Sequence, residues 1–355
     1  MKKILIVNSH IPWGGLGQFT LSLVDGLKSN NYELYGMITH SNSDNFSLFD
    51  KMLDQNYYIG NLGKIKKYFS AIKYIYSIKP DVIIINYNAV IHFILPFLPK
   101  TKVIDIIHND VGDFYRISNI NNKHVSLWIA PTPGIKNGFL QYTKNAKLQM
   151  QNTKVISHGV SLSKNDTDSK NEDIFNIIFV GAVYEHKGAD LLPEIFNKIK
   201  QKSKNVKLSI VGDGILREEL ELKFKELGLD KDVVFHGVIP HEEVRKKMAE
   251  SHVLLFPTRV EAFGLVIAEA MMEGAVPIVT LLEGITDATV KNGKTGYLIQ
   301  KNDIEAFSSK ITELINNKEL YKMLSIRTKD YAKKHLSIDS MSATYDKEIK
   351  RLINE

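Results

Sequence analysis

Short apolar runs of strand length recur along the first half of the chain, and amphipathic stretches separate them. The runs are KILIVN, YELYGMIT, DVIIINY and KVIDII (residues 3–8, 32–39, 81–87 and 102–107). Between them, LGQFTLSLVDGLKSN (16–30) and IKKYFSAIKYIYSIK (65–79) place apolar residues at helical spacing. Continuous Val/Ile runs separated by helical patterns are typical of βαβ units around a buried parallel sheet.

The pattern stops in a polar segment and then starts again. SLSKNDTDSKNED (161–173) has almost no hydrophobic content and reads as a linker. The runs that follow are NIIFVG, KLSIVGDG, DVVFHG, VLLFP and PIVT, with helical patterns at 189–202 and in REELELKFKELGL (217–229). We therefore predict an α/β protein with two doubly wound, Rossmann-like parallel-sheet domains, at residues 1–165 and 166–335, joined near residue 165. SIDSMSATYDKEIKRLINE, at the end of the chain, is predicted to form a helix over 336–355.

Composition agrees with this organisation. The length of 355 residues suits two domains, and the 44% hydrophobic and 24% charged contents are those of a globular protein. The chain has no cysteine, which excludes a disulfide framework, a thiol nucleophile and a cysteine metal site, and which fits a reducing compartment. The apolar run at the N-terminus is too short for a signal peptide, and polar residues and a proline interrupt the apolar region 82–99. We expect a soluble, cytoplasmic protein.

Positive charge is concentrated in the first half. Residues 1–160 hold 17 Lys and Arg against 9 Asp and Glu (+8), and the remainder holds 29 against 31 (−2). Much of the excess lies in GKIKKYFSAIKYIYSIK (63–79), where lysines alternate with apolar residues at roughly helical spacing. This pattern fits either an ordinary surface helix with solvated lysines or a face that rests on anionic lipid headgroups, at the inner face of the plasma membrane. Nucleic acid is a less suitable partner, because no helix-turn-helix, zinc finger or aromatic platform accompanies the lysines.

Ligands of open parallel sheets bind outside the carboxyl ends of the strands, so each strand end is a candidate site. The first strand runs into glycines at 14, 15 and 17, before a helix, where backbone N–H groups can approach an anion. The spacing is not G-x-G-x-x-G, and no acidic residue closes the second strand, so a nicotinamide site is not expected. The glycines are equally consistent with a tight turn and with a ligand loop.

Two further strand ends carry candidate side chains. KVIDII leads into His108, which is either a structural histidine or a group that holds a substrate hydroxyl. FVGAVYEHKG places Gly181 at a strand end and Lys187 in the loop after it. Lys187 is either a surface lysine before a helix or a point charge suited to a diphosphate.

The segment PTRVEAFGLVIAEAMME (257–273) carries the most informative strand end. A helix is predicted to start at Gly264, where unpaired N–H groups and the positive end of the helix dipole favour an anion. Glu261 precedes this start and can accept hydrogen bonds from sugar hydroxyls. Glu269, about one and a half turns into the helix, suits a bidentate bond to a ribose diol. The spacing indicates a sugar nucleotide, although a capping glutamate followed by a solvent-facing one is a common structural alternative.

This segment resembles the E-x7-E motif of the retaining glycosyltransferases of family 4, which have the GT-B fold. FVGAVYEHKG, LSIVGDGILREELE, VVFHGVIPHEEV, LLFPTRVEAFGLVIAEAMMEGAVPIV and NGKTGYLI occur in the order and spacing of that family. The resemblance extends from the glycine loop to about residue 300 and is densest over 177–298. Five motifs in order are far more specific than one.

The resemblance implies a role for each matching position. Glu261 would contact the donor sugar, Glu269 the ribose and Lys187 the diphosphate, with His108 near the reacting carbon. The remaining implied donor contacts are Gly15, Gly17, Gly181, Phe263, Gly264 and Leu265, with the base held by the loop His236, Gly237, Val238 and Ile239. The last helix would cross back onto the N-terminal domain, which would bind the acceptor.

The resemblance also bears on mechanism. Retention of configuration can come from a double displacement on a carboxylate, or from front-face attack in which the departing phosphate takes the acceptor's proton; the family is usually interpreted in the second way. Electrostatic stabilisation of the leaving diphosphate by Lys187 and the helix start would then dominate. No metal or other cofactor is expected. The two D-x-D strings, Asp166-Thr167-Asp168 and Asp230-Lys231-Asp232, do not resemble a metal motif in their contexts.

Three positions depart from the family pattern. Ala182 stands where an arginine is usual, so one diphosphate cation is missing, and Arg259 is a candidate to replace it. Glu283-Gly284 replaces a common Gly-Gly pair, and Asp287 replaces a glutamate. Because these positions border the donor sugar, the identity of the donor is the least determined part of the prediction.

The leading hypothesis is therefore a retaining, metal-independent transferase that moves a hexose or N-acetylhexosamine from a nucleotide-diphosphate sugar, UDP favoured over GDP. The acceptor would be a glycan or lipid-linked glycan of surface polysaccharide or lipopolysaccharide assembly. A sugar-nucleotide epimerase of the same fold is an alternative that needs no acceptor. A non-catalytic nucleotide-sugar-binding protein is another, which Ala182 supports and the set Lys187, Glu261 and Glu269 opposes.

Overall fold

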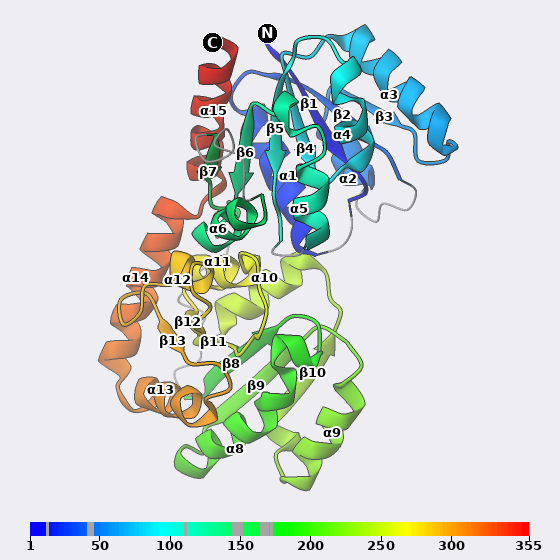
Figure 1. Cartoon of the computed structure of the whole chain (residues 1–355). Helices are drawn as coiled ribbons and strands as arrows, with labels where there is room; N and C mark the ends of the chain where they lie inside the picture. Colours follow the sequence, from blue (N-terminus) through cyan, green and yellow to red (C-terminus); the bar gives the residue numbers. More distant parts are fainter. Residues whose placement is uncertain are drawn as a thin grey trace. The chain divides into compact units, whose positions relative to one another are not determined.

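The computed structural model describes residues 1–11, 14–40, 46–109, 112–143, 152–163, 170 and 173–354 (Figure 1). The chain forms two compact units: unit 1 comprises Met1–Gly159 and Ser337–Glu355, and unit 2 comprises Val160–Leu336. The junction predicted near residue 165 lies outside the described residues. Each unit contains one parallel sheet, as predicted for two doubly wound domains.

The sheet of unit 1 has the order β3-β2-β1-β4-β5-β6-β7, and every pair of neighbouring strands is parallel. Its strands are β1 (Lys3–Asn8), β2 (Glu33–Ile38), β3 (Gln55–Tyr58), β4 (Val82–Asn86), β5 (Lys102–Ile106), β6 (Leu127–Ala130) and β7 (Thr153–Val155). The strand order reverses between β1 and β4, and this reversal is the topological switch point at which doubly wound sheets bind ligands. In that pair, Asn8 lies opposite Asn86 at the carboxyl ends of the strands.

Burial on both faces explains the uninterrupted Val/Ile runs of this sheet. The side chains of Ile4 to Val7 in β1 and of Val82 to Ile85 in β4 are fully buried. A parallel sheet needs apolar residues toward both faces, because its crossover connections cover both with helices. The strand predictions for KILIVN, YELYGMIT, DVIIINY and KVIDII are confirmed.

The helices of unit 1 surround this sheet. They are α1 (Gly15–Lys28), α2 (Phe46–Lys51), α3 (Lys64–Ile78), α4 (Ala89–Ile94), α5 (Gly112–Ser118), α6 (Pro133–Tyr142) and α15 (Ile338–Asn354), with 3₁₀ turns η1 (Leu95–Phe97) and η2 (Asn122–His124). α15 packs on α1 so closely that a Cβ at Gly26 would lie 2.6 Å from Ser342 Cβ. α3 contacts α4, α4 contacts α5, and α5 contacts α6. Among the described residues, no helix combines the length and hydropathy that crossing a bilayer requires.

The sheet of unit 2 has the order β10-β9-β8-β11-β12-β13, again parallel throughout. Its strands are β8 (Phe175–Val180), β9 (Val206–Val211), β10 (Val233–Gly237), β11 (Val253–Phe256), β12 (Val276–Thr280) and β13 (Tyr297–Ile299). The switch point of this sheet lies between β8 and β11. The two loops that carry Lys187 and Glu261 therefore follow the two strands that flank it.

The helices of unit 2 complete its βα units. They are α8 (Leu192–Lys202), α9 (Arg217–Glu226), α10 (His241–Glu250), α11 (Leu265–Met272), α12 (Thr286–Thr289), α13 (Ile304–Asn316) and α14 (Lys318–His335), with 3₁₀ turns η4 (Glu185–Lys187), η5 (Ala189–Leu191) and η6 (Asp230–Asp232). The single core of the unit includes most of α11, whose residues Ile267 to Met272 are all buried. The core holds the α11 backbone rigidly, and with it the start of the helix at the carboxyl edge of the sheet.

Candidate functional site

Two loops meet at the switch point of unit 2, one after β8 and one after β11. Gly188 has φ of +72°, and a Cβ there would lie 2.0 Å from the carbonyl oxygen of Pro257, so only glycine allows this approach. The Arg259 amide donates to the His186 carbonyl oxygen at 2.9 Å, and the Thr258 hydroxyl donates to the same oxygen at 3.3 Å. These contacts fix each loop against the other.

The joined loops bring Lys187 and Glu261 into direct contact. Lys187 Nζ lies 2.8 Å from Glu261 Oε2, and the side chains are 22% and 15% exposed. The other carboxylate oxygen of Glu261 accepts from the Ala262 amide at 3.1 Å. Lys187 Nζ also lies 5.8 Å from the ring centroid of Phe256, the last residue of β11. The two predicted contacts to the diphosphate and to the sugar are thus one ion pair, in which Glu261 is the counterion of Lys187.

The start of α11 lies immediately after this pair. Gly264 precedes the helix with φ of +77° and ψ of 62°, and a Cβ there would lie 2.8 Å from Ile267 Cδ1. No side chain caps the helix, and its first turn contains no acidic residue. Phe263 is buried and Leu265 packs on the core, so both anchor the loop. The first turn of the helix thus supplies no carboxylate, and the nearby Glu261 in the preceding loop is paired with Lys187, an arrangement that favours an anionic ligand at the helix start.

Glu269 has a partner that the sequence analysis missed. His241, the first residue of α10, places its Nε2 2.7 Å from Glu269 Oε1. The Glu269 side chain is 9% exposed and that of His241 38%. The histidine therefore orients the carboxylate and covers part of its access from solvent. The available signal was the position of His241 directly after Pro240 in the VIPHEEV motif, at the end of the predicted base-binding loop.

Arg259 is engaged elsewhere in unit 2. Its guanidinium makes a bidentate pair with Asp190 at 2.6 and 2.8 Å, and its Nε donates to Asn302 Oδ1 at 2.9 Å. A further bond goes to the carbonyl oxygen of Glu185. The Asp190 carboxylate holds the pKa of Arg259 above its usual value. Because Asp190 and Asn302 already hold the guanidinium, the geometry does not favour the prediction that Arg259 replaces the missing diphosphate cation.

The predicted base-binding loop ends β10 at the carboxyl edge of the same sheet. His236 Nε2 lies 3.3 Å from the Ser209 hydroxyl, and burial together with nearby Lys247 lowers the pKa of His236. Gly237 has φ of +66°, and its carbonyl oxygen accepts from the Gly212 amide at 2.8 Å. Val238 is 81% exposed, whereas Ile239 packs on the core. The loop is thus anchored at both ends and exposes the residue between them.

The remaining strand ends of unit 2 hold Gly181 and two buried oxygens. The Gly181 amide donates to the Val211 carbonyl oxygen at 3.0 Å, which ties the end of β8 to β9. At the end of β12, Thr280 Oγ1 and Asp287 Oδ1 are buried and have no hydrogen-bond partner in the described part of the chain. Buried polar atoms of this kind are satisfied by water or by a ligand. Asp287 is one of the positions at which the sequence departs from the pattern of the family that it resembles.

The switch point of unit 1 carries neutral groups. His108 Nε2 lies 3.0 Å from Asn86 Oδ1, a contact in which the tautomer with the proton on Nε2 donates to the amide oxygen. Burial lowers the pKa of His108 to about 4, against the opposing effect of Asp105. The side-chain nitrogens of Asn8 and Asn86 are buried and have no partner among the described residues. Neither asparagine was among the predicted site residues, although asparagine at the end of a Val/Ile strand is itself an unusual choice.

The glycine loop of unit 1 leads into α1. Gly14, with φ of +102°, precedes the helix, which starts at Gly15, and Gly17 is buried while Gly15 is exposed. The first turn contains no acidic residue. The Thr20 hydroxyl donates to Asn8 Oδ1 at 3.2 Å, so the helix is tied to the end of β1.

The structure therefore distributes the predicted site over two sheet edges. Lys187, Glu261, Gly264 and Glu269 lie at the carboxyl edge of unit 2 with the base loop. His108 and the glycine loop lie at that of unit 1. Among the described residues, no three or more His, Cys, Asp or Glu side chains are arranged to hold a metal ion. Asp166-Thr167-Asp168 lies outside those residues, and Asp232 of the other D-x-D string pairs with Lys200 at 2.7 Å.

Comparison with known families gives a match for unit 2. Residues 163–331 match the family model described as glycosyl transferases group 1. This range contains the Lys187–Glu261 pair, the start of α11 and the His241–Glu269 pair. Their position within the matched segment agrees with the density of motifs seen in the sequence.

Comparison with individual proteins gives partial relatives and full-length structural neighbours. An uncharacterized glycosyltransferase of Methanocaldococcus jannaschii is 32% identical over 222 residues, which are 62% of this chain and 58% of that protein. The capsular polysaccharide biosynthesis glycosyltransferase CapM of Staphylococcus aureus is 32% identical over 155 residues, 42% of this chain and 38% of that protein. The chain thus spans less than two thirds of the length of these relatives. HepE of Anabaena, solved in complex with UDP and glucose, superposes with a TM-score of 0.82 over 99% of this chain and 100% of its own, at 17% identity. The fold is GT-B, as predicted.

Proposed function

We propose that this chain, which carries a glycosyl transferases group 1 segment on a GT-B fold, is a retaining glycosyltransferase that uses a nucleotide-diphosphate sugar. It would move a hexose or N-acetylhexosamine to a glycan or lipid-linked glycan acceptor without a metal ion. Unit 2 would bind the donor, and unit 1 would bind the acceptor.

One observation carries the proposal: the Lys187–Glu261 pair at the switch point of unit 2, directly before the uncapped start of α11. A diphosphate at this place would meet the Lys187 ammonium and the positive end of a helix. Its approach would offer Lys187 a second anion and leave Glu261 to accept hydrogen bonds from sugar hydroxyls. The pair therefore suits a ligand that joins a diphosphate to a sugar.

Glu269 and His241 suit the ribose of the same ligand. With Oε1 held by His241, the second oxygen of Glu269 is oriented by a rigid, buried helix. A carboxylate in this position accepts hydrogen bonds from a vicinal diol, and bonds to a charged acceptor are among the stronger ones.

The comparisons support the choice of donor and acceptor. HepE of Anabaena has been solved with UDP and with UDP-glucose, and CapM acts in capsular polysaccharide biosynthesis. We accordingly favour a UDP-sugar over a GDP-sugar and an acceptor in surface polysaccharide or lipopolysaccharide assembly. The absence of cysteine supports a cytoplasmic location.

In the proposed mechanism, bond cleavage puts negative charge on the leaving diphosphate. Lys187 and the N–H groups at the start of α11 would stabilise this charge, and donors placed in this way are worth about 10²- to 10³-fold in rate each. The departing phosphate would take the acceptor's proton on the same face of the sugar, which retains its configuration. His108, neutral at pH 7 because burial lowers its pKa to about 4, would accept a hydrogen bond from a substrate hydroxyl.

The test is thermal stabilisation by a panel of UDP- and GDP-sugars, with and without EDTA. At about 100 times the dissociation constant, a ligand adds roughly 2.7 kcal/mol to the free energy of unfolding. We expect one donor class to stabilise the wild type regardless of EDTA and to stabilise Glu269→Gln less, whereas Lys200→Ala, which breaks an ion pair remote from this edge, behaves as wild type. Retention is then checked by the anomeric configuration of the product in proton NMR spectra.

Other outcomes would select the alternatives. Ala182 and the engagement of Arg259 by Asp190 leave the diphosphate site with one cation fewer than the family pattern. Stabilisation by a nucleotide sugar, without turnover on any acceptor, would favour a non-catalytic binding protein. Conversion of the sugar itself without an acceptor would favour an epimerase. No stabilisation by any nucleotide sugar would reject the donor site.

A further inference from the structure

Unit 1 exposes a group of large apolar side chains on α3, α4 and η1. Ile65 and Phe69 of α3 are each 71% exposed and Tyr76 is 49% exposed; Phe93 of α4 is 49% and Phe97 of η1 65% exposed. We call these five residues the α3 patch. Single exposed apolar residues need no explanation, but a contiguous group marks a surface that another partner covers.

α3 has two apolar faces, and the fold uses only one. Ala71, Tyr74, Ile75 and Ile78 are buried against unit 1. Ile65, Phe69 and Tyr76, spaced by four and seven residues, share a different side of the helix, at about 100° per residue. A helix on the surface of a globular protein needs only one apolar stripe, so packing of unit 1 does not account for the second.

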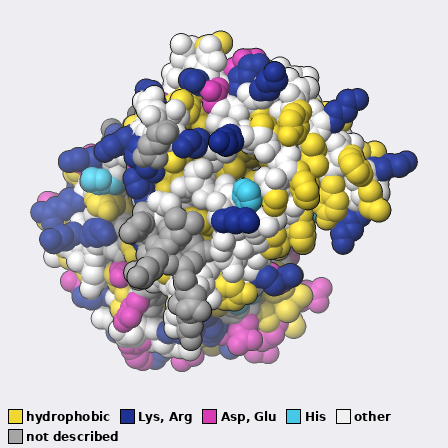
Figure 2. Space-filling view, turned by 45° about the horizontal axis from the view of Figure 1, so that its top comes forward, with side chains coloured by type: hydrophobic (Ala, Val, Ile, Leu, Met, Phe, Trp, Pro, Cys, Tyr) yellow, Lys and Arg dark blue, Asp and Glu magenta, His cyan; other side chains and the backbone are white. Residues whose placement is uncertain are grey.

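The neighbouring elements extend the second face. The rings of Tyr68 and Phe93 lie 6.3 Å apart between centroids, which places α4 beside α3. The Tyr76 hydroxyl donates to the Phe97 carbonyl oxygen at 3.3 Å, which places η1 beside the end of α3. In Figure 2, hydrophobic side chains gather on the right of the view, on the side where α3 and α4 lie, with Lys and Arg side chains at their margin.

Lysines without ion-pair partners border the α3 patch. Within the described residues, none of the following makes a salt bridge: Lys64, Lys66, Lys67, Lys73, Lys79, Lys100 and Lys102. We call these seven residues the lysine rim. Their charges are therefore available to an external partner, and the only partner chemistry that complements them is anionic.

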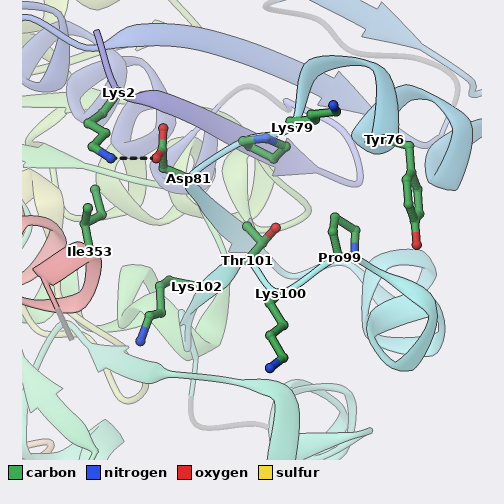
Figure 3. A pocket seen from close by; sticks show the side chains of 10 residues that line it. Lys2, Tyr76, Lys79, Asp81, Pro99, Lys100, Thr101, Lys102 and Ile353 are labelled. Carbon is green, nitrogen blue, oxygen red and sulfur yellow. Dashed lines mark hydrogen bonds and ion pairs between the residues drawn. The ribbon is translucent and has the colours of Figure 1, made fainter.

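Figure 3 shows how the rim is arranged at the amino ends of β1, β4 and β5. A cavity of about 440 Å³ is lined by Lys79, Lys100 and Lys102, by Tyr76 of the patch, and by Lys2, whose ammonium pairs with Asp81 at 3.0 Å. The amino groups of Lys79, Lys100 and Lys102 point in different directions and do not converge. Such a splayed set attracts an extended anionic surface rather than gripping a single phosphate group.

We propose that the α3 patch and the lysine rim dock unit 1 on a bilayer that contains anionic lipids. α3 lies along the surface, the apolar side chains enter the acyl boundary, and the lysines contact lipid phosphates. Interfacial helices bind in this way through apolar area and electrostatic attraction together. A second copy of the chain is a poorer occupant, because pairing two α3 patches would bring two lysine rims together.

Vesicle flotation with the full chain tests the proposal, without nucleotide or acceptor. We expect binding to vesicles of phosphatidylcholine with phosphatidylglycerol, weaker binding as salt is raised, and little binding to phosphatidylcholine alone. Phe69→Ser with Phe97→Ser should lower the partition coefficient about tenfold. Lys73→Glu with Lys100→Glu should lower it at least as much, because each lysine near an anionic surface is worth about fivefold.

Matched variants in unit 2 provide the controls. Leu222→Ser with Ile326→Ser removes apolar side chains of similar exposure, 62% and 63%, and Lys301→Glu with Lys322→Glu makes the same charge change. Both pairs should bind vesicles as the wild type does. Stabilisation by UDP, measured on every variant, shows that the donor site is intact and separates failure of this proposal from failure of the proposed function.

Insertion has a direct readout in Phe69→Trp. Brominated lipids should quench the fluorescence that this tryptophan adds, and they should not quench that of Ile215→Trp, a control at 76% exposure. The proposal is overturned if the wild type ignores anionic vesicles, or if the patch variants bind as well as the controls. It is also overturned if sedimentation shows a dimer that Phe69→Ser dissociates while vesicle binding is absent.

Discussion

Two sheets of one topology end in opposite chemistries. Both sheets reverse their strand order between the first and fourth strand, β1 and β4 in unit 1 and β8 and β11 in unit 2. At the edge of unit 2, Lys187 forms a partly exposed ion pair with Glu261, and His241 lies within hydrogen-bond distance of Glu269. At the edge of unit 1, Asn8 and Asn86 are buried, and desolvation lowers the pKa of the partly buried His108 to about 4.

The difference shows that topology locates a binding edge and that the strand-end residues decide what it binds. Because the Lys187–Glu261 pair is partly exposed, its charges cost little desolvation, and this edge suits the anionic donor of the proposed function. Desolvation lowers the pKa of His108 in unit 1, so this edge suits the uncharged hydroxyl of the proposed acceptor. A transferase needs one of each, since its donor is a diphosphate and its acceptor is a hydroxyl.

Removal of the Lys187 cation from the edge of unit 2 should cause the largest loss of transfer activity. Lys187→Ala should lower the transfer rate about 10³-fold, since it removes the charge that faces the diphosphate and leaves Glu261 without its counterion. Initial rates with a radiolabelled donor measure this. Lys200→Ala removes a lysine paired at 2.7 Å with Asp232 elsewhere in the unit and should change the rate less than twofold. Equal losses in the two variants would show a stability effect rather than a donor contact.

The neutral edge is tested by His108→Gln. We expect transfer to fall about 10²-fold, because the imidazole acceptor is lost, while the dissociation constant for UDP, measured by calorimetry, is unchanged. Lys187→Ala should weaken both. A loss of UDP affinity in His108→Gln would place the histidine at the donor site. It would contradict the proposal that the two edges bind different substrates.

The free energy of unfolding should fall in acid, and His108 should account for part of this fall. Its pKa is about 4 in the folded chain and about 6.5 when unfolded, so the unfolded state binds more protons between these values. The free energy of unfolding therefore falls as pH falls through this window, by at most about 1.4 kcal/mol per pH unit for this group. Urea denaturation at pH 7, 6 and 5 should show a shallower fall for His108→Gln.

Other histidines contribute to the same window, so the comparison needs a matched variant. Burial also lowers the pKa of His158 well below its usual value. Because the wild type keeps both His108 and His158, its free energy of unfolding should fall most steeply as the pH falls. His335→Gln changes an exposed histidine and should keep the wild-type slope. Identical slopes in all three proteins would mean that the His108 ring is not buried in solution.

The smallest expected effect concerns the ribose contact. Glu269→Gln should weaken UDP binding by about 1.5 kcal/mol, and His241→Ala by about 1 kcal/mol, because the first changes the acceptor and the second only its orientation. Neither substitution should weaken the binding of 2′-deoxy-UDP as much as it weakens the binding of UDP. A double-mutant cycle with the two nucleotides measures the coupling, and a coupling of zero would place the ribose elsewhere.

The sequence predicted the long, buried strands and missed the short ones. Val/Ile runs revealed β1, β4 and β8, since burial on both faces leaves no polar interruption. β3 reads QNYY and no residue in it is buried, and β7 and β13 have three residues each. Such strands are specified by pairing with an existing sheet, which local patterns do not record.

The site divides in a similar way. The positions of Lys187, Glu261 and Glu269 at strand ends followed from local spacing, and their roles stay predictions. The partners of Glu269 and Arg259 did not follow, because His241 and Asp190 are 28 and 69 residues away in the chain. Which ion pairs form is decided by long-range packing, and a single sequence gives no record of it.

The discontinuous make-up of unit 1 has a consequence for biosynthesis. Its closing helix, α15, is translated only after residues 160–336, which takes roughly 10 to 35 seconds at typical ribosomal speeds. During that interval the surface of α1 around Gly26 lacks its cover, so the first segment emerges as a sheet with one bare flank. Unit 2 is contiguous and can complete itself on the ribosome. Unit 2 is thus finished first, and unit 1 is the last to mature.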